Sequence, residues 1–122
     1  MARLIMTVDD SASMREMVRA TLTSAGYQVV EAVDGQEALD YARENPCDLV
    51  ISDVNMPRMD GITLVHELRS LPHYRLTPLL LLTTESSQEK KLEGKRAGAT
   101  GWIVKPIDPE HLRRWVRRLL PR

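Results

Sequence analysis

The chain has 122 residues, about the length of one domain, and a chain of this size can fold without disulfides or a structural metal. Its 17 lysines and arginines balance 17 acidic residues, so gross charge indicates neither nucleic acid nor an anionic membrane as a partner. Aromatic residues are only 4% of the chain, too few for a base-stacking platform. The one cysteine, Cys47, suits a reducing compartment, and the N-terminal residues have no signal-peptide pattern. We therefore expect one cytoplasmic, monomeric domain over residues 1–122, with no DNA and no membrane partner.

Short apolar runs alternate along the chain with segments of helical periodicity, a pattern typical of a parallel sheet built from βα units. In chain order, the expected strands are residues 4–8, 27–32, 49–52, 79–82 and 101–104. Cap residues mark the expected starts of four helices: Ser13, Asp34, Asp60 and Asp108. The order of elements predicts an α/β fold in which five strands and five helices alternate.

The last two expected helices differ in composition. In residues 86–97, Leu92 is nearly the only large apolar residue and Gly94 costs about 1 kcal/mol relative to alanine, so we expect a marginal and mobile helix. The last helix has a core stripe made of Leu112, Val116 and Leu119. Trp115 lies at the edge of that stripe, so we expect it to be partly buried. The opposite face carries Arg113, Arg114, Arg117 and Arg118. We interpret it as a solvated face or as a site for an anionic partner, either an acidic protein surface or a nucleotide second messenger.

Polar side chains follow four of the five expected strands. They are Asp9, Asp10, Asp53, Thr83 and Lys105. The carboxyl ends of parallel strands form the ligand-binding edge of such a sheet. Converging carboxylates repel one another unless a cation lies among them, and oxygen ligands favour Mg²⁺ over Zn²⁺. A carboxylate nucleophile, a metal, a lysine and a hydroxyl are the groups that phosphoryl transfer requires.

Four segments resemble the receiver domain of bacterial response regulators. They are Val8-Asp-Asp-Ser11, Ser52-Asp-Val-Asn-Met-Pro-Arg-Met-Asp-Gly61, Leu82-Thr-Thr84 and Ala97-Gly-Ala-Thr-Gly-Trp-Ile-Val-Lys-Pro106. The resemblance extends from Arg3 to about Leu120 and is strongest for stand-alone chemotaxis regulators of the CheY type. It implies a flavodoxin-like, doubly wound (βα)5 fold with parallel strands in the order 2-1-3-4-5. It also implies a signalling switch that catalyses its own phosphorylation and dephosphorylation, and not a metabolic enzyme.

The resemblance assigns the acceptor and the metal ligands residue by residue. It implies that Asp53 accepts a phosphoryl group from a CheA-like histidine kinase. Asp10 would bind Mg²⁺ directly, Asp9 would bind it mainly through water, and the backbone carbonyl of Asn55 would complete the protein ligands. Mn²⁺ is the alternative ion.

The resemblance also assigns a switch. Lys105 would pair with the phosphoryl group and precede Pro106 in a cis peptide bond, Thr83 would move to bind the phosphoryl group, and Trp102 would sense that movement. Trp102 departs from the family, which usually has tyrosine, another smaller aromatic residue or histidine there, and an indole is larger than the inward pocket of the family's switch accommodates. Asn55 and Glu85 are expected to flank the attacking water and so to set the lifetime of the phosphorylated state.

The expected partner surface is the face formed by the fourth helix, the fifth strand and the fifth helix. Its residues are Lys91, Lys95, Trp102, Trp115 and Arg118. Partly exposed tryptophans flanked by cations suit an acidic, amphipathic partner helix. The output protein could be a flagellar switch component, and a phosphatase is a further candidate partner. Alternatively, both tryptophans are ordinary packing residues.

Other classes of protein share parts of this pattern. An aspartyl-phosphate phosphohydrolase usually has a second acid where this chain has Asn55. A flavin-binding electron carrier needs a phosphate loop, and Asp9 and Asp10 would repel that phosphate. A degenerate receiver would lack part of the acidic site. The chain ends just after its last expected helix, so output passes through another molecule unless the receiver was cut from a longer regulator. A single-domain regulator outside chemotaxis is a further alternative.

Overall fold

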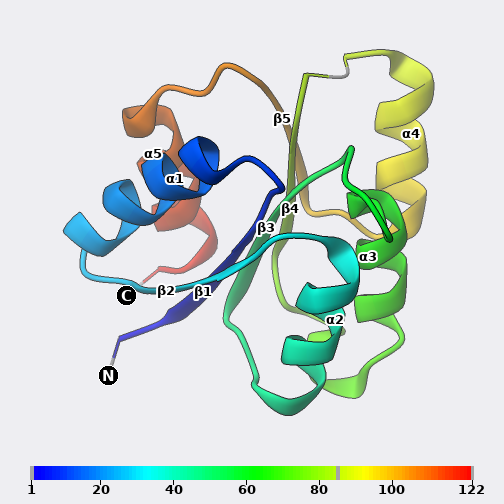
Figure 1. The fold of residues 1–122 in the computed structure, drawn as a ribbon, viewed down its shortest axis with the longest axis horizontal. Helices are drawn as coiled ribbons and strands as arrows, with labels where there is room; N and C mark the ends of the chain where they lie inside the picture. Colours follow the sequence, from blue (N-terminus) through cyan, green and yellow to red (C-terminus); the bar gives the residue numbers. More distant parts are fainter. Residues whose placement is uncertain (1, 85, 122) are drawn as a thin grey trace.

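Five parallel strands form one sheet in the computed structural model, which describes residues 2–84 and 86–121 (Figure 1). The strands are β1 (Leu4–Val8), β2 (Gln28–Ala32), β3 (Leu49–Asp53), β4 (Leu79–Thr83) and β5 (Gly101–Val104). Their order across the sheet is β2-β1-β3-β4-β5. The flavodoxin-like fold and strand order implied by the sequence are therefore confirmed.

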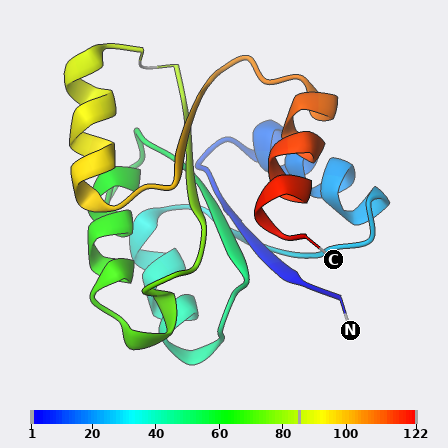
Figure 2. The ribbon, with the colours of Figure 1, turned by 180° about the vertical axis from the view of Figure 1, so that it is seen from behind.

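Helices cover both faces of the sheet. They are α1 (Ala12–Ser24), α2 (Gly35–Glu44), α3 (Gly61–Arg69), α4 (Gln88–Ala97) and α5 (Pro109–Leu119). Helices α1 and α5 lie on one side, and α2, α3 and α4 lie on the other, as both views show (Figures 1 and 2). Each side has its own apolar core: Leu22 and Val116 belong to the first, and Leu64 and Leu81 to the second. None of the described helices is both long enough and apolar enough to cross a membrane.

The central strands place the candidate site. All residues of β3 and β4 are buried, as expected of parallel strands covered on both faces. Val8 at the end of β1 pairs with Ser52, and Asp53 at the end of β3 pairs with Leu82. This register brings the carboxyl ends of three neighbouring strands to one edge of the sheet.

The helix starts agree with the sequence at three positions and differ at one. Asp34 and Asp60 cap α2 and α3 as predicted, because their carboxylates accept the N–H groups of Glu37 and Thr63. The predicted cap of α1 is wrong. Ser11, and not Ser13, accepts the N–H of Met14 at 3.3 Å. Asp108 is the N-cap residue of α5 and Pro109 begins the helix, as predicted, although the Asp108 side chain makes no cap hydrogen bond.

Two further differences lie near the ends of elements. A 3₁₀ turn at Pro72–Tyr74, which the sequence pattern did not predict, connects α3 to β4. In α5, Leu112 and Val116 are fully buried as expected, but Leu119 is only half-buried, and Leu120 beyond the helix is buried instead. The core stripe of α5 therefore continues past the helix end.

Helix α4 has fewer described buried residues than any other α-helix of the molecule. Gly94 is its one buried residue among those described. It begins at Gln88, two residues later than predicted, and ends at Ala97, followed by Gly98, which has a left-handed φ of 112°. The Arg69 guanidinium donates to the carbonyl oxygen of Gly98 at 2.8 and 3.0 Å, so a direct side-chain contact holds the C-terminal end of α4.

Candidate functional site

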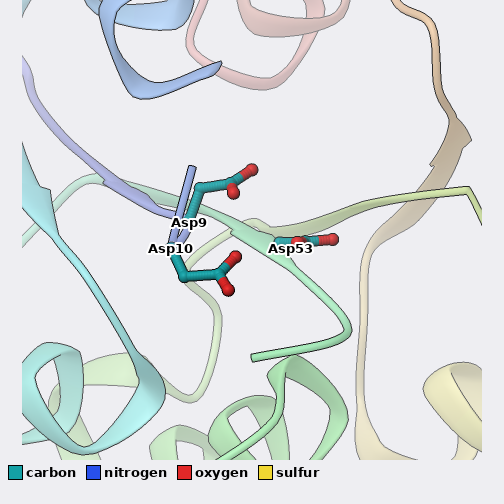
Figure 3. A group of neighbouring side chains, drawn as sticks. All are labelled: Asp9, Asp10 and Asp53. Atoms are coloured by element: carbon teal, nitrogen blue, oxygen red, sulfur yellow. The ribbon is translucent and has the colours of Figure 1, made fainter. Parts of the chain in front are cut away.

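Three carboxylates gather where β1 and β3 end (Figure 3). Oxygen atoms of Asp9, Asp10 and Asp53 all lie within 4.8 Å of one another. Asp9 and Asp53 are buried, whereas Asp10 is exposed. The sequence therefore identified a set of acids that the fold brings together.

Lys105 reaches the same site from the segment that follows β5. Its Nζ atom lies 3.1 Å from Oδ2 of Asp9 and 3.4 Å from Oδ1 of Asp53. The backbone N–H of Lys105 donates to the carbonyl oxygen of Thr83, which carries the pairing of β4 and β5 past the end of β5. The peptide bond between Lys105 and Pro106 is cis, as the resemblance implies.

The surroundings of Asp53 make its charged form unfavourable. Burial raises the pKa of this carboxyl group, and the neighbouring Asp9 raises it further. Lys105 and the N–H of Val54, which donates to Oδ1 at 2.8 Å, act in the opposite direction. A further cation among these acids would stabilise the ionised carboxylate, which is the form that can act as a nucleophile.

Asp9 is held by groups that the sequence analysis did not assign. The N–H of Ser11 donates to Oδ1 of Asp9 at 2.9 Å. Arg15 donates to the backbone carbonyl of Asp9 at 2.6 Å and also pairs with Glu31 at 3.1 Å. Arg15 lies within the range of the resemblance to the receiver family, Arg3 to about Leu120, but its contact with Asp9 could not be read from the sequence.

The loop after β3, which contains Asn55, is held by an ion pair between Arg58 and Asp34, the residue that caps α2. Arg58 donates to Asp34 through two nitrogen atoms, at 2.7 and 3.1 Å. This pairing lowers the pKa of Asp34. Arg58 has a φ of 67°, which is uncommon for a residue with a side chain. The N–H of Gly35 also donates to the carbonyl oxygen of Met59, so the loop is held at two points.

Gly61 allows α3 to approach the end of β3. A Cβ atom at this position would overlap the carbonyl oxygen of Asp53. The N–H of Gly61 donates to the carbonyl oxygen of Val54 at 2.8 Å, which fixes the chain directly after the acceptor candidate. In the sequence, the Asp60-Gly61 pair marks the start of α3 but does not reveal this contact with β3.

The remaining predicted residues lie at or beyond the edge of the acidic site. Thr83 is fully buried at the end of β4, and Asn55 is exposed. Glu85, predicted to tune dephosphorylation, lies outside the described residues.

The predicted partner face divides at the edge strand β5. Trp102 packs with the core under α2, α3 and α4, whereas Trp115 packs with the core under α1 and α5. Both tryptophans are half-buried. Lys91 and Lys95 are exposed and line a hollow of about 400 Å³ that Trp102 also lines, while the Arg118 guanidinium lies 5.8 Å from the centre of the Trp115 ring.

The residues at the strand ends fit a hard divalent cation. Asp9, Asp10 and Asp53 supply only oxygen donors, which is the ligand type that Mg²⁺ prefers. Asp9 and Asp53 already face a positive charge, that of Lys105. A solved receiver domain of the sensor kinase PA1611 from Pseudomonas aeruginosa, 27% identical over 98% of this chain and 98% of that chain with a TM-score of 0.90, is described with a magnesium ion coordinated in its active-site cleft.

Comparison with known proteins defines the family. The model of the response regulator receiver domain matches residues 5–117. The chain therefore belongs to the receiver domain family of response regulators, as the acidic site and the fold indicate. In structure it is similar to the chemotaxis protein CheY4 of Vibrio cholerae, with 51% identity, a TM-score of 0.94, and coverage of 98% of this chain and 100% of that one.

Relatives in sequence include both short and long regulators. The CheY homologue of Campylobacter jejuni is 36% identical over 95% of this chain and 91% of its own length. The response regulator MprA of Mycobacterium sp. strain KMS is 41% identical over 97% of this chain. The chain spans about half the length of MprA and of the ycf27 regulator of Porphyridium aerugineum. Membership of the receiver domain family therefore does not by itself identify the signalling pathway.

Proposed function

We propose that this chain is a phosphorylation-dependent switch of a two-component system, in which Asp53 accepts a phosphoryl group from a histidine kinase. The observation that supports this most directly is the contact of Lys105 with both Asp9 and Asp53 inside a cluster of three carboxylates. One buried acid with a raised pKa, flanked by a fixed cation and by two further acids, is suited to form an acyl phosphate.

The proposed reaction is an in-line displacement at phosphorus. A carboxylate oxygen of Asp53 forms a bond to the phosphorus atom while the bond from phosphorus to the histidine nitrogen breaks. The electron pair of that bond stays on the histidine nitrogen, which takes up a proton. Lys105 then lies within reach of the new phosphoryl oxygens, and the Thr83 hydroxyl supplies a hydrogen bond once it moves toward them.

Asp9, Asp10, Asp53 and the backbone carbonyl of Asn55 would hold Mg²⁺, with Mn²⁺ as the alternative. When bound, the ion neutralises charge on the acids and on the transferred group. The chain's own part is to keep these oxygens in place. Ser11 and Arg15 hold Asp9, Val54 holds Asp53, and the ion pair of Arg58 holds the loop that carries Asn55.

We further propose that phosphorylation changes the affinity of the α4–β5–α5 face for an output protein. The exposed Lys91 and Lys95 and the half-buried Trp102 lie together around one hollow, and this combination suits an acidic, amphipathic helix. Trp115 and Arg118 extend the face on the other side of β5.

Chemotaxis is the pathway that we propose, with a CheA-like kinase as donor and a flagellar switch component as one output partner. Support comes from the match to nearly the whole length of two proteins named for chemotaxis, CheY4 of Vibrio cholerae and the CheY homologue of Campylobacter jejuni. The alternative is a receiver of a longer or non-chemotaxis regulator, for which the match to half of MprA is the observation in favour. In either case we propose a cytoplasmic location.

Acetyl phosphate tests the acceptor assignment without the kinase. The intact mass of the chain should rise by one phosphoryl group with Mg²⁺ and stay unchanged with EDTA. Asp53→Asn should abolish labelling, whereas Asp40→Asn, a matched change of an exposed carboxylate on α2, should leave it unchanged. Labelling that persists in Asp53→Asn would contradict the assignment.

A further inference from the structure

Each of the two tryptophans lies against a glycine. A Cβ atom on Gly94 of α4 would lie 3.0 Å from Cζ3 and 3.1 Å from Cε3 of Trp102. A Cβ atom on Gly101 of β5 would lie 2.9 Å from Cζ3 and 3.0 Å from Cη2 of Trp115. In both cases the six-membered ring of the indole takes the space that a side chain would need.

We propose that Gly94 is a positioning residue of the switch: its missing side chain is what allows a tryptophan to stand at position 102, and it couples the position of the indole to that of α4. The part of this inference that concerns switching rests on the proposed function. The part that concerns packing does not.

The space around Gly94 is closed on a second side. The same Cβ atom would lie 3.1 Å from Cδ1 of Leu81, which is fully buried in β4. Distances of this kind are tighter than ordinary van der Waals contact, so a neighbour must move. Leu81 is surrounded by core, whereas Trp102 is only half-buried. The indole is therefore the group that would be displaced.

A glycine inside a helix is unfavourable, and α4 has no other described buried residue with which to offset that effect. If α4 only needed to form, alanine would serve better at position 94. The contact with the Trp102 ring gives a reason for glycine that helix formation does not.

The indole is held by packing and not by a hydrogen bond. Nε1 of Trp102 is buried and has no hydrogen-bond partner among the described residues. Burying an unpaired donor is unfavourable. This effect favours an arrangement in which the N–H of Trp102 meets water or an acceptor. Gly94 and Leu81 favour the observed arrangement. Small movements of α4 therefore change which arrangement is preferred.

The packing part is tested by a thermal-unfolding cycle. Gly94→Ala should lower Tm in the parent chain, because the added methyl group meets the indole. In a Trp102→Tyr background, which lacks the ring carrying Cε3 and Cζ3, the same change should raise Tm through the better helix propensity of alanine. Glu93→Ala, at the neighbouring exposed position on α4, should have the same effect on Tm in both backgrounds.

The difference between the two effects of Gly94→Ala decides the result. A difference of several degrees supports the coupling, and so does a Gly94→Ala chain that folds only with Trp102→Tyr. Equal effects in both backgrounds overturn it, as does a double variant that fails to fold.

The switching part is tested in a Trp115→Phe background, where Trp102 is the only tryptophan. Gly94→Ala should increase acrylamide quenching of Trp102. It should also reduce the fluorescence change caused by beryllofluoride with Mg²⁺ by at least half, while acetyl phosphate labels the chain within twofold of the parent. An unchanged fluorescence response in Gly94→Ala would overturn this role. Failure of the parent to label would contradict the proposed function instead and would leave the Tm cycle unaffected.

Discussion

The acidic site and the α4–β5 side are built from different kinds of contact. At the acidic site, Asp9, Asp53 and Lys105 are fixed by ion pairs and backbone hydrogen bonds of 2.8 to 3.4 Å. On the α4–β5 side, Gly94 is the one buried residue described in the helix, and the Trp102 N–H has no described partner. The first region is held by directional contacts. In the second, Arg69 holds the C-terminal end of α4, but the Trp102 indole is held by packing.

This difference indicates that the two regions have different functions. Phosphoryl transfer needs atoms held close to one geometry before the donor arrives. A response at the surface needs an element that a small change in free energy can move, and such elements come from weakly packed regions. The two regions share β4. Its last residue is Thr83, and its Leu81 pairs with Trp102 of β5 and borders the space at Gly94.

The largest expected effect is on binding of the output partner, and it separates that binding from phosphorylation at the acidic site. Trp102→Ala and Trp115→Ala should each weaken binding of the output partner by about tenfold or more, because aromatic residues often carry most of the binding energy. Labelling by acetyl phosphate should stay intact in both. The partner recovered from the native cell with the beryllofluoride-loaded chain provides the binding assay. Wild-type affinity in both variants would place the partner surface elsewhere.

A several-fold effect is expected on the lifetime of the phosphorylated chain. Asn55 and Glu85 are polar, and polar side chains beside the acyl phosphate can position the attacking water. Replacing Glu85 by leucine or lysine should change the decay rate of label on Asp53 by several-fold, measured by intact mass after removal of acetyl phosphate. Asn55→Leu should act in the same way. If decay is the same in all these variants, the two positions do not control hydrolysis.

A smaller effect is expected on stability, with a sign set by the raised pKa of Asp53. The fold favours the protonated form of the Asp53 carboxyl group. The resulting contribution to the free energy of unfolding is full below the ordinary carboxyl pKa of about 4, and it is lost as pH rises through the raised pKa of Asp53. Asp53→Asn should therefore raise Tm at pH 7 by on the order of a few degrees, and by much less near pH 4.

Mg²⁺ provides the control for that prediction. A cation that binds the folded acids should stabilise the parent chain by mass action and so narrow the gap to Asp53→Asn. Thermal unfolding at several pH values with EDTA or Mg²⁺ measures both effects. An Asp53→Asn variant that is less stable than the parent at pH 7 in EDTA would show that the site is not strained by its own charge.

The smallest effect concerns the ion pair that holds the loop after β3. Arg58 lowers the pKa of Asp34, so the pair contributes stability above the ordinary carboxyl pKa, and this contribution is lost as pH falls through the lowered value. Arg58→Ala should lower Tm slightly at pH 7 and less at pH 3. Arg58→Gly should lose less, because glycine adopts a φ of 67° without strain. If both variants lower Tm by the same amount, backbone strain at position 58 does not contribute to stability.

The two regions also differ in how far the sequence predicted them. The acids and Lys105 could be predicted because parallel strands bring their carboxyl ends to one edge whatever the details of the loops. The pairing of Arg58 with Asp34 could not, since it depends on a left-handed backbone conformation and on two loops 24 residues apart. The cap at Ser11 was missed because Ser13 also fits the pattern, and only the backbone of the loop distinguishes them.

The role of Gly94 shows the same limit on the α4–β5 side. Composition identified Gly94 as unfavourable for helix formation, and the resemblance to the receiver family marked Trp102 as a departure. Neither pattern linked the two residues, because the link is a contact between a helix and a strand edge. Contacts of this kind depend on packing distances of a few tenths of an ångström, which periodicity does not specify.

Hydrogen exchange with and without beryllofluoride and Mg²⁺ tests the central claim most directly. The claim is that charge added at Asp53 is held by the contacts of the acidic site and changes the packing on the α4–β5 side. Amide exchange should change in the described residues from Gln88 to Val104 and stay nearly constant in α2, and Asp53→Asn should show neither change. Exchange that changes only beside the strand ends, with α4 and β5 unaffected, would contradict the account.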